Sequence, residues 1–254
     1  MSIELTEKQL KWLDSQPDLP NADKPENRCA LIWIGGSHAY GLADKNSDVD
    51  VRAATMPTMR QFLSLHDYGE KHMPSSDMVV RSYLKVARML RDANPNMVEL
   101  TNLPVDCILH CDDYGFRLLQ LAQRIAVNRK CATTFAGYAY QQTALAERRE
   151  HEGDSRRADK AKAHALRVYH MGTILLESGE VQVCRVGIDQ EELLAIRHGD
   201  YDHERYDSTL REARIRFEEA VERTRLPQPI DDGELRDMVL PIIQQYAKRL
   251  FKTL

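Results

Sequence analysis

The pattern of apolar and polar positions divides the chain into a mixed N-terminal part and a long helical C-terminal part. The apolar run at residues 30–34 is short and contains β-branched side chains, which is typical of a buried strand. Residues 47–53 alternate between polar and apolar side chains, and a third strand is predicted at residues 77–81. Helices are predicted at 6–15, 57–64, 82–93, 114–128, 132–150, 156–177, 189–198, 207–224 and 232–254, with a short extended piece at 181–186.

This order of elements predicts an α/β (α+β) fold. We expect a small mixed sheet with helices packed against it, followed by a helical C-terminal domain. The prolines at 17, 20 and 25 separate the first helix from the first strand. The predicted boundaries are therefore an N-terminal helical arm at 1–27, a sheet domain at 28–112 and a helical domain at 113–254.

The turn after the first strand and the start of the second carry the candidate chemistry. Gly35, Gly36 and Ser37 interrupt the apolar run, and glycines there let the backbone approach a ligand closely. A helix beginning at Ser37 would turn backbone N–H groups towards phosphates. Asp48 and Asp50 are two residues apart in a strand, so their carboxylates share one face and repel each other unless a cation is bound. Mg²⁺ is the hard cation that such oxygen ligands prefer.

Gly36-Ser37, followed after ten residues by Asp48-Val49-Asp50, resembles the signature of the DNA polymerase β-like nucleotidyltransferase superfamily. Within that superfamily, the segment GSHAYGLADKNSDVDVR is similar to a subgroup of bacterial and phage predicted nucleotidyltransferases. Shorter matches extend the resemblance over most of the chain, from Ile34 to Gly199. They are Asn94-Pro95 with Glu99-Leu100, then His164-Ala165-Leu166-Arg167, then Ile196-Arg197-His198-Gly199.

The resemblance implies a nucleotidyltransferase that uses a nucleoside triphosphate and two Mg²⁺ ions. Asp48, Asp50 and Asp77 would be the catalytic carboxylates and metal ligands, and Gly36 and Ser37 would bind the nucleotide. An alternative stays open for the third carboxylate, because Asp77 could also cap a helix or turn. Asp67 and Glu70 are its rivals, and they flank a glycine in a loop.

Three donors further along the chain are additional candidates for nucleotide binding. Lys160, His164 and Arg167 are four and three residues apart, so they share one face of a helix. They either hold triphosphate oxygens or form an ordinary surface stripe. Two alternatives also stay open for Glu99, which the resemblance includes: it contacts a group at the metal site or forms a structural salt bridge. His38 and Tyr40 either contact nucleotide or are packed or solvated.

Composition narrows the class of protein. A chain of 254 residues with 43% hydrophobic and 29% charged residues is typical of a globular protein with a large core. A net charge of −4 weighs against a general DNA-binding protein. The N-terminus lacks the apolar segment of a signal peptide, no apolar run is long enough to span a membrane, and the five cysteines have no disulfide-framework spacing, so we expect a cytoplasmic protein.

The sequence leaves both the acceptor and the class of function open. The acceptor hydroxyl could belong to RNA, to a protein or to a small molecule, and the sequence specifies no oligomeric state. The rival functions are a non-catalytic nucleotide-sensing module and an antitoxin-like interaction protein. Filled acidic positions at 48, 50 and 77 favour the enzyme over a module that has lost its chemistry.

Overall fold

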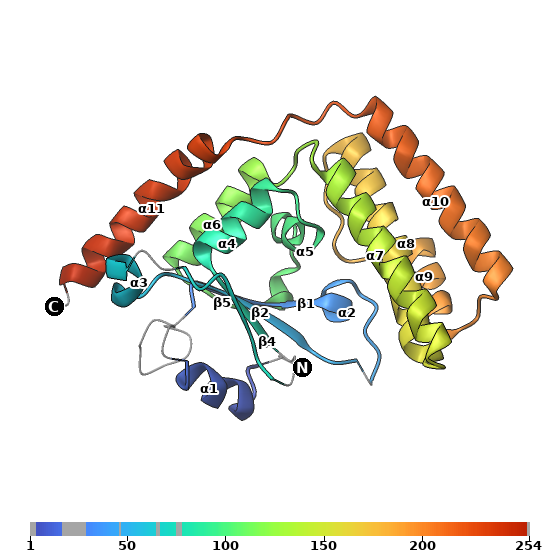
Figure 1. The fold of residues 1–254 in the computed structure, drawn as a ribbon, viewed down its shortest axis with the longest axis horizontal. Helices are drawn as coiled ribbons and strands as arrows, with labels where there is room; N and C mark the ends of the chain where they lie inside the picture. Colours follow the sequence, from blue (N-terminus) through green and yellow to red (C-terminus); the bar gives the residue numbers. More distant parts are fainter. Residues whose placement is uncertain (1–3, 17–28, 46, 65–66, 75–77, 253–254) are drawn as a thin grey trace. The chain divides into compact units, whose positions relative to one another are not determined.

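The structure is a computed structural model, and it describes residues 4–16, 29–45, 47–64, 67–74 and 78–252 (Figure 1). The chain forms two compact units that interleave in sequence. We call them the sheet unit (Met1–Arg91, Leu103–Ile125 and Ile230–Leu254) and the helical unit (Asp92–Asn102 and Ala126–Pro229). In the described part of the chain, no helix combines the length and the apolar character needed to cross a bilayer.

The sheet unit is built on a mixed sheet. Within the described residues its strands are β1 Leu31–Gly35, β2 Asp50–Thr55, β3 Glu70–His72, β4 Met78–Ser82 and β5 Ile108–Cys111. Their order across the sheet is β3-β4-β2-β1-β5. β2 and β4 are parallel, and the other neighbouring pairs are antiparallel. The predicted mixed sheet and α/β fold class are confirmed.

The neighbouring strands β1 and β2 differ in the burial of their two faces. β1 is buried along its whole length, as its continuous apolar sequence predicts. In β2, Val51 and Ala53 are buried in a cluster that includes Leu13 of the N-terminal helix. Asp50 and Arg52 are half-buried and point to the opposite face, because successive strand residues alternate. The predicted alternation is present, although β2 begins at Asp50 and not at residue 47.

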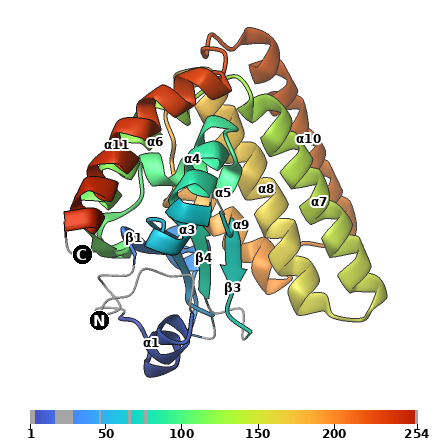
Figure 2. The same cartoon turned by 60° about the vertical axis from the view of Figure 1, so that its left-hand side comes forward.

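Helices lie on both faces of the sheet. Within the described residues, the α-helices of the sheet unit are α1 Glu7–Asp14, α2 Gly36–Ala39, α3 Met59–Ser64, α4 Tyr83–Arg91, α6 Asp113–Ile125 and α11 Asp232–Lys252. α1 lies on one face and α4 and α6 lie on the other (Figures 1 and 2). α1 starts with a capping box between Thr6 and Gln9. α11 packs on α4 and α6, where Tyr114 and Tyr246 meet edge to face with ring centroids 5.2 Å apart.

The helical unit is a set of long helices centred on one of them. Its α-helices are α5 Pro95–Val98, α7 Cys131–His151, α8 Ser155–Ser178, α9 Ile188–His198 and α10 His203–Arg223. α8 packs on α7, α9 and α10. A Cβ on Gly172 of α8 would lie 2.6 Å from the ring of Phe217 and 2.9 Å from that of Phe135. The absence of a side chain at Gly172 therefore permits the close approach of both rings.

The structure also contains strands that the sequence pattern does not predict. β3 and β5 were not predicted, because a three-residue and a four-residue edge strand give too short a pattern to detect. Residues 181–186 contain no strand. The predicted domain segments 1–27, 28–112 and 113–254 stay a prediction. The compact units interleave in sequence, because α6 packs on β1 and β5 and α11 packs on α4 and α6.

Candidate active site

The glycine turn, which we define as Gly35, Gly36 and Ser37, lies directly beside the start of β2. β1 ends at Gly35, and α2 begins at Gly36 as a single turn of helix. In the antiparallel register of β1 and β2, Gly35 is the partner of Asp50. Sequence positions fifteen residues apart are thus adjacent, and this adjacency brings the predicted phosphate-binding backbone to one of the predicted metal ligands.

Gly36 and Asp50 are in direct contact. Gly36 has φ +62°, a backbone conformation that favours glycine. A Cβ on Gly36 would lie 1.9 Å from Oδ2 of Asp50, so the carboxylate rests against the Gly36 backbone. Any other residue at this position would displace the carboxylate. Glycine at position 36 is therefore required by the packing of Asp50 as well as by the backbone conformation of the turn.

Hydrogen bonds hold the loop between the glycine turn and β2. The N–H of Leu42 donates to the carbonyl of Ser37 at 2.9 Å, which closes the turn. The Ser47 hydroxyl donates to the Asp44 carboxylate at 3.2 Å, and Nε2 of His38 lies 3.4 Å from the Ser47 carbonyl. Tyr40 is buried, which favours the packed role left open for it, and His38 is half-buried.

Asp48 and Asp50 differ in exposure. Asp48 is exposed and precedes β2, whereas Asp50 is half-buried as the first residue of the strand. Their carboxylate oxygens are the hard donors that Mg²⁺ prefers, and Mg²⁺ is commonly held by only one or two carboxylates together with substrate phosphates. Among the described residues there is no cluster of three or more metal-ligating side chains. The donor chemistry of this aspartate pair fits Mg²⁺ shared with a triphosphate.

The third predicted carboxylate, Asp77, lies outside the described residues. The strand that follows it in sequence, β4, is the parallel neighbour of β2, and Met78 pairs with Val51. The two rivals have other partners. Oε2 of Glu70 lies 2.5 Å from Nε of Arg81. Burial alone would raise the pKa of Glu70, but Arg81 and His72 together lower it.

The other rival, Asp67, makes contacts in and near its own loop. Its carboxylate accepts a hydrogen bond of 3.1 Å from the N–H of Gly69, and it faces Arg88 at 3.5 Å. Both rivals are thus engaged in contacts at the β3 edge of the sheet unit. These contacts favour Asp77 as the third carboxylate, and that assignment stays a prediction.

The three predicted donors on α8 belong to the helical unit and share one helix face, but their exposure falls along the helix. Lys160 is exposed, His164 is half-buried and Arg167 is 1% exposed. Nη2 of Arg167 lies 3.1 Å from Nε2 of His164. Their role in nucleotide binding stays a prediction, for which the exposed Lys160 offers the most accessible group.

Arg167 forms an ion pair inside the helical unit. Its Nη2 lies 3.6 Å from Oε1 of Glu99, whose side chain is 0% exposed. Of the two roles left open for Glu99, this contact supports the structural salt bridge. The placement likewise indicates that Arg167 stabilises the helical unit.

A second buried arginine was not predicted from the sequence. Arg185 is 0% exposed, and its Nη1 lies 3.6 Å from Oδ2 of Asp189. Burial lowers the pKa of Arg185 to about 10, against the opposing effect of Asp189. The buried neighbours Val181 and Val183 were the available signal, because an arginine in an otherwise apolar stretch must find a partner when it is buried.

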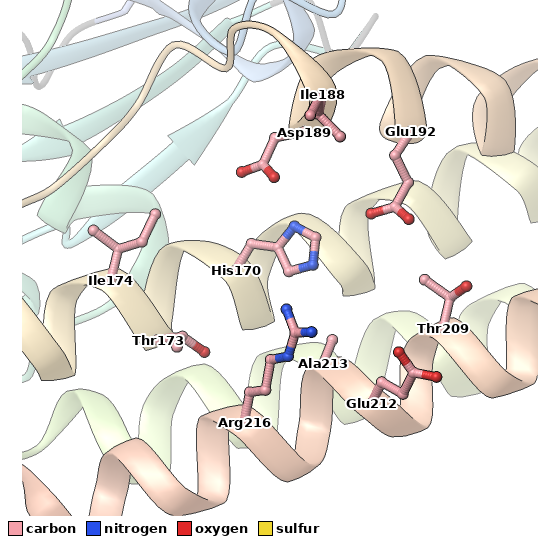
Figure 3. Close-up of a pocket in the computed structure, with 10 residues that line it drawn as sticks. All are labelled: His170, Thr173, Ile174, Ile188, Asp189, Glu192, Thr209, Glu212, Ala213 and Arg216. Carbon is pink, nitrogen blue, oxygen red and sulfur yellow. The ribbon is translucent and has the colours of Figure 1, made fainter.

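A polar pocket of about 400 Å³ lies beside Asp189 in the helical unit. Figure 3 shows His170 of α8 at its centre, with Arg216 reaching towards it from α10 and Asp189 and Glu192 facing it from α9. Two of the carboxylates already have protein partners: Asp189 faces Arg185, and Glu192 accepts a hydrogen bond of 3.3 Å from the Tyr201 hydroxyl. Contacts within the helical unit thus already engage two of the carboxylates that line the pocket.

We expect His170 to make the stability of the protein depend on pH. Burial lowers the pKa of His170; Asp189 opposes this effect, and Arg185 and Arg216 add to it. The unfolded chain therefore binds a proton more readily than the folded one, and the stabilisation present above about pH 6.5 is lost on acidification. We expect the free energy of unfolding, measured in urea, to fall between pH 8 and pH 5.5.

His170→Gln should make that fall smaller than in the wild type. His203→Gln is the matched control, because the His203 ring is 77% exposed. The control should leave the pH dependence unchanged. An identical pH dependence in His170→Gln and the wild type would contradict the assignment to His170.

Comparison with known proteins identifies one family. The family described as RlaP, the RNA repair pathway DNA polymerase beta family, matches residues 22–238. The match confirms the resemblance to DNA polymerase β-like nucleotidyltransferases that the sequence motifs indicate. A search of curated proteins gave no match.

One solved structure is also similar to the chain. It is a nucleotidyltransferase-like protein from Exiguobacterium sibiricum 255-15, with 13% sequence identity. The similarity covers 84% of this chain and 71% of that chain, with a TM-score of 0.30.

Proposed function

Since the chain belongs to the RNA repair pathway DNA polymerase beta family, we propose that it is a Mg²⁺-dependent nucleotidyltransferase. It would transfer a nucleoside monophosphate from a nucleoside triphosphate to an acceptor hydroxyl and release pyrophosphate. The observation that carries the proposal is the contact between the Asp50 carboxylate and the Gly36 backbone. The contact supports the proposal, because the Asp50 carboxylate would hold a cation close to a turn whose backbone N–H groups would receive phosphates.

Each residue of the site has a role in this proposal. Asp48, Asp50 and Asp77 would hold two Mg²⁺ ions, which when bound stabilise the charge of the attacking and leaving oxygens. Gly36 and Ser37 would bind the β- and γ-phosphates through backbone N–H groups and the serine hydroxyl. Asp77 would accept the proton of the acceptor hydroxyl as that oxygen bonds to the α-phosphorus. The bond from the α-phosphorus to the bridging oxygen then breaks, and pyrophosphate leaves.

The proposed nucleotide contacts extend to α8. Lys160 and His164 are the donors on that helix whose side chains are exposed or half-buried. Arg167 would act mainly through its contact with Glu99, which orders the helix on which the other two lie. We also propose that the protein acts in the cytoplasm.

The family to which the chain belongs favours one of the possible acceptors. Of the three acceptors that the sequence leaves open, RNA agrees with the RNA repair pathway in that description. An RNA hydroxyl is therefore the first acceptor to test, with a protein hydroxyl and a small molecule as alternatives.

A labelled-triphosphate assay tests the proposal. The purified protein is incubated with each triphosphate labelled at the α-phosphate, with Mg²⁺, and with or without an RNA carrying a free 3′ hydroxyl. We expect label on the RNA and an equal amount of pyrophosphate, and we expect EDTA to abolish both. Nucleotide binding without pyrophosphate release would instead favour the nucleotide-sensing alternative.

Gly36→Ala should strongly reduce transfer, because the new Cβ would displace the Asp50 carboxylate. A misplacement of about 1 Å in a catalytic group can cost about a hundredfold in rate. Gly69→Ala is the matched control: Gly69 has φ +69°, close to the +62° of Gly36, but nothing lies within 4 Å of its added Cβ. The control should lose stability by a similar backbone strain and keep its transfer rate. Equal rates for the two variants would show that the Gly36 contact has no role in the reaction.

A further inference from the structure

The guanidinium of Arg52 lies over the glycine turn. A Cβ on Gly35 would be 2.5 Å from Cζ and 2.6 Å from Nε of Arg52. In the register of β1 and β2, however, Arg52 pairs with Trp33, and Gly35 pairs with Asp50. The side chain of Arg52 therefore reaches along β1 by two residues, towards the end of the strand where Asp50 and the turn lie.

The two consecutive glycines accommodate two charged side chains of opposite sign. Gly36 receives the carboxylate of Asp50, and Gly35 receives the guanidinium of Arg52. Both side chains come from the same face of β2, because they are two residues apart in a strand. A carboxylate suited to a cation and a guanidinium suited to an anion thus converge on the same short piece of backbone.

The neighbouring arginine on the next strand has its own partner. Arg81 of β4 pairs in register with Ala54, so it lies on the same face as Arg52. Burial lowers the pKa of Arg81, Glu70 opposes that effect, and the positive charge of Arg52 lowers it further. Glu70 lies 2.5 Å from Arg81. A cation bound at Asp50 and an anion bound at Arg52 would each meet a charge of opposite sign.

From this geometry we infer that Arg52 is a phosphate-binding residue of the proposed transfer site, an inference that rests on the proposed function. Its planar fork of donors suits two oxygens of one phosphate group. The guanidinium donates to non-bridging oxygens of the triphosphate and keeps these contacts while pyrophosphate leaves. Arg52 thereby adds a side-chain cation to the backbone N–H groups of the glycine turn.

Nucleotide affinity tests the role of Arg52. Calorimetry with Mg²⁺ and the α,β-methylene analogues of ATP and GTP should show binding to the wild type. Arg52→Gln should raise the dissociation constant by on the order of tenfold to a hundredfold, the effect of losing charge-assisted hydrogen bonds. Arg52→Lys, which keeps the charge and loses the fork, should be intermediate. Arg88→Gln, at a 54% exposed arginine of the same unit, controls for net charge and should bind as the wild type does.

Gly35→Ala tests the geometry without removing the charge. Gly35 has φ −109°, which alanine adopts freely, but its Cβ would force the guanidinium away. The variant should therefore weaken binding as Arg52→Gln does, and the double variant should be no weaker than either single one. Thermal unfolding of each variant verifies that it is folded.

The outcomes separate this inference from the proposed function. Transfer and analogue binding by the wild type, with an unchanged dissociation constant in Arg52→Gln, would overturn the inference and leave the function standing. Additive losses in the Gly35→Ala and Arg52→Gln pair would also overturn it. Absence of both binding and transfer in the wild type would overturn the function, and this inference with it.

Discussion

Asp50→Asn should abolish nucleotidyl transfer while the protein stays folded, and Asp48→Asn should do the same. Each variant removes a charged ligand of the proposed Mg²⁺ site, and stabilisation of the transferring phosphate depends on those ions. The sequence spacing predicts that the two carboxylates repel each other in the metal-free protein, so thermal stability without Mg²⁺ should be unchanged or slightly higher. The measurements are a transfer assay and a thermal melt in EDTA.

Asp44→Asn is the matched control for that pair of variants. Asp44 precedes β2 in the same loop, and asparagine keeps the acceptor oxygen for its bond with the Ser47 hydroxyl. The control should retain transfer. Full activity in both Asp48→Asn and Asp50→Asn would disprove the metal site. In the same assay, Asp77→Ala should keep nucleotide binding and lose turnover if Asp77 is the third carboxylate.

Arg167→Ala should produce the largest loss of stability that we expect from a single substitution outside the sheet. The variant leaves the carboxylate of Glu99, which is 0% exposed, without its guanidinium partner. Removing one member of a buried ion pair costs about 3–5 kcal/mol of unfolding free energy. Urea unfolding of the wild type and the variant measures the loss.

Two further variants show whether the loss belongs to the buried pair. The double variant Glu99→Gln, Arg167→Met removes both charges, and it should recover much of the stability lost in Arg167→Ala. Arg214→Ala removes one member of an exposed pair with Glu218, 65% and 58% exposed, and should cost at most about 1 kcal/mol. A loss in Arg167→Ala no larger than in Arg214→Ala would contradict the structural role.

The centre of the sheet unit could be predicted from the sequence because its signals are local. The apolar run of β1, the glycines that end it and the alternation around Asp50 each follow from the geometry of a strand or a turn. The adjacency of Gly36 and Asp50 could be predicted as well, because two strands joined by a short connection commonly pair.

The rest depends on contacts between distant parts of the chain. β3 and β5 are edge strands whose sequences, EKH and ILHC, acquire their pairing only from β4 and β1. A helical pattern counts Arg167 as a polar position, yet its partner Glu99 lies 68 residues away and allows it to be buried. The packing of α11 on α4 and α6 likewise cannot be predicted from any local sequence pattern.

The most direct test of the central claim is the ratio of transferred label to pyrophosphate in a single reaction with Mg²⁺. The wild-type protein, an α-labelled triphosphate and an acceptor RNA are mixed, and both products are quantified over time. Nucleotidyl transfer predicts one pyrophosphate for each labelled monophosphate joined to the acceptor, and neither product with Asp50→Asn. Orthophosphate in place of pyrophosphate, or label transfer that persists in Asp50→Asn, would contradict the account.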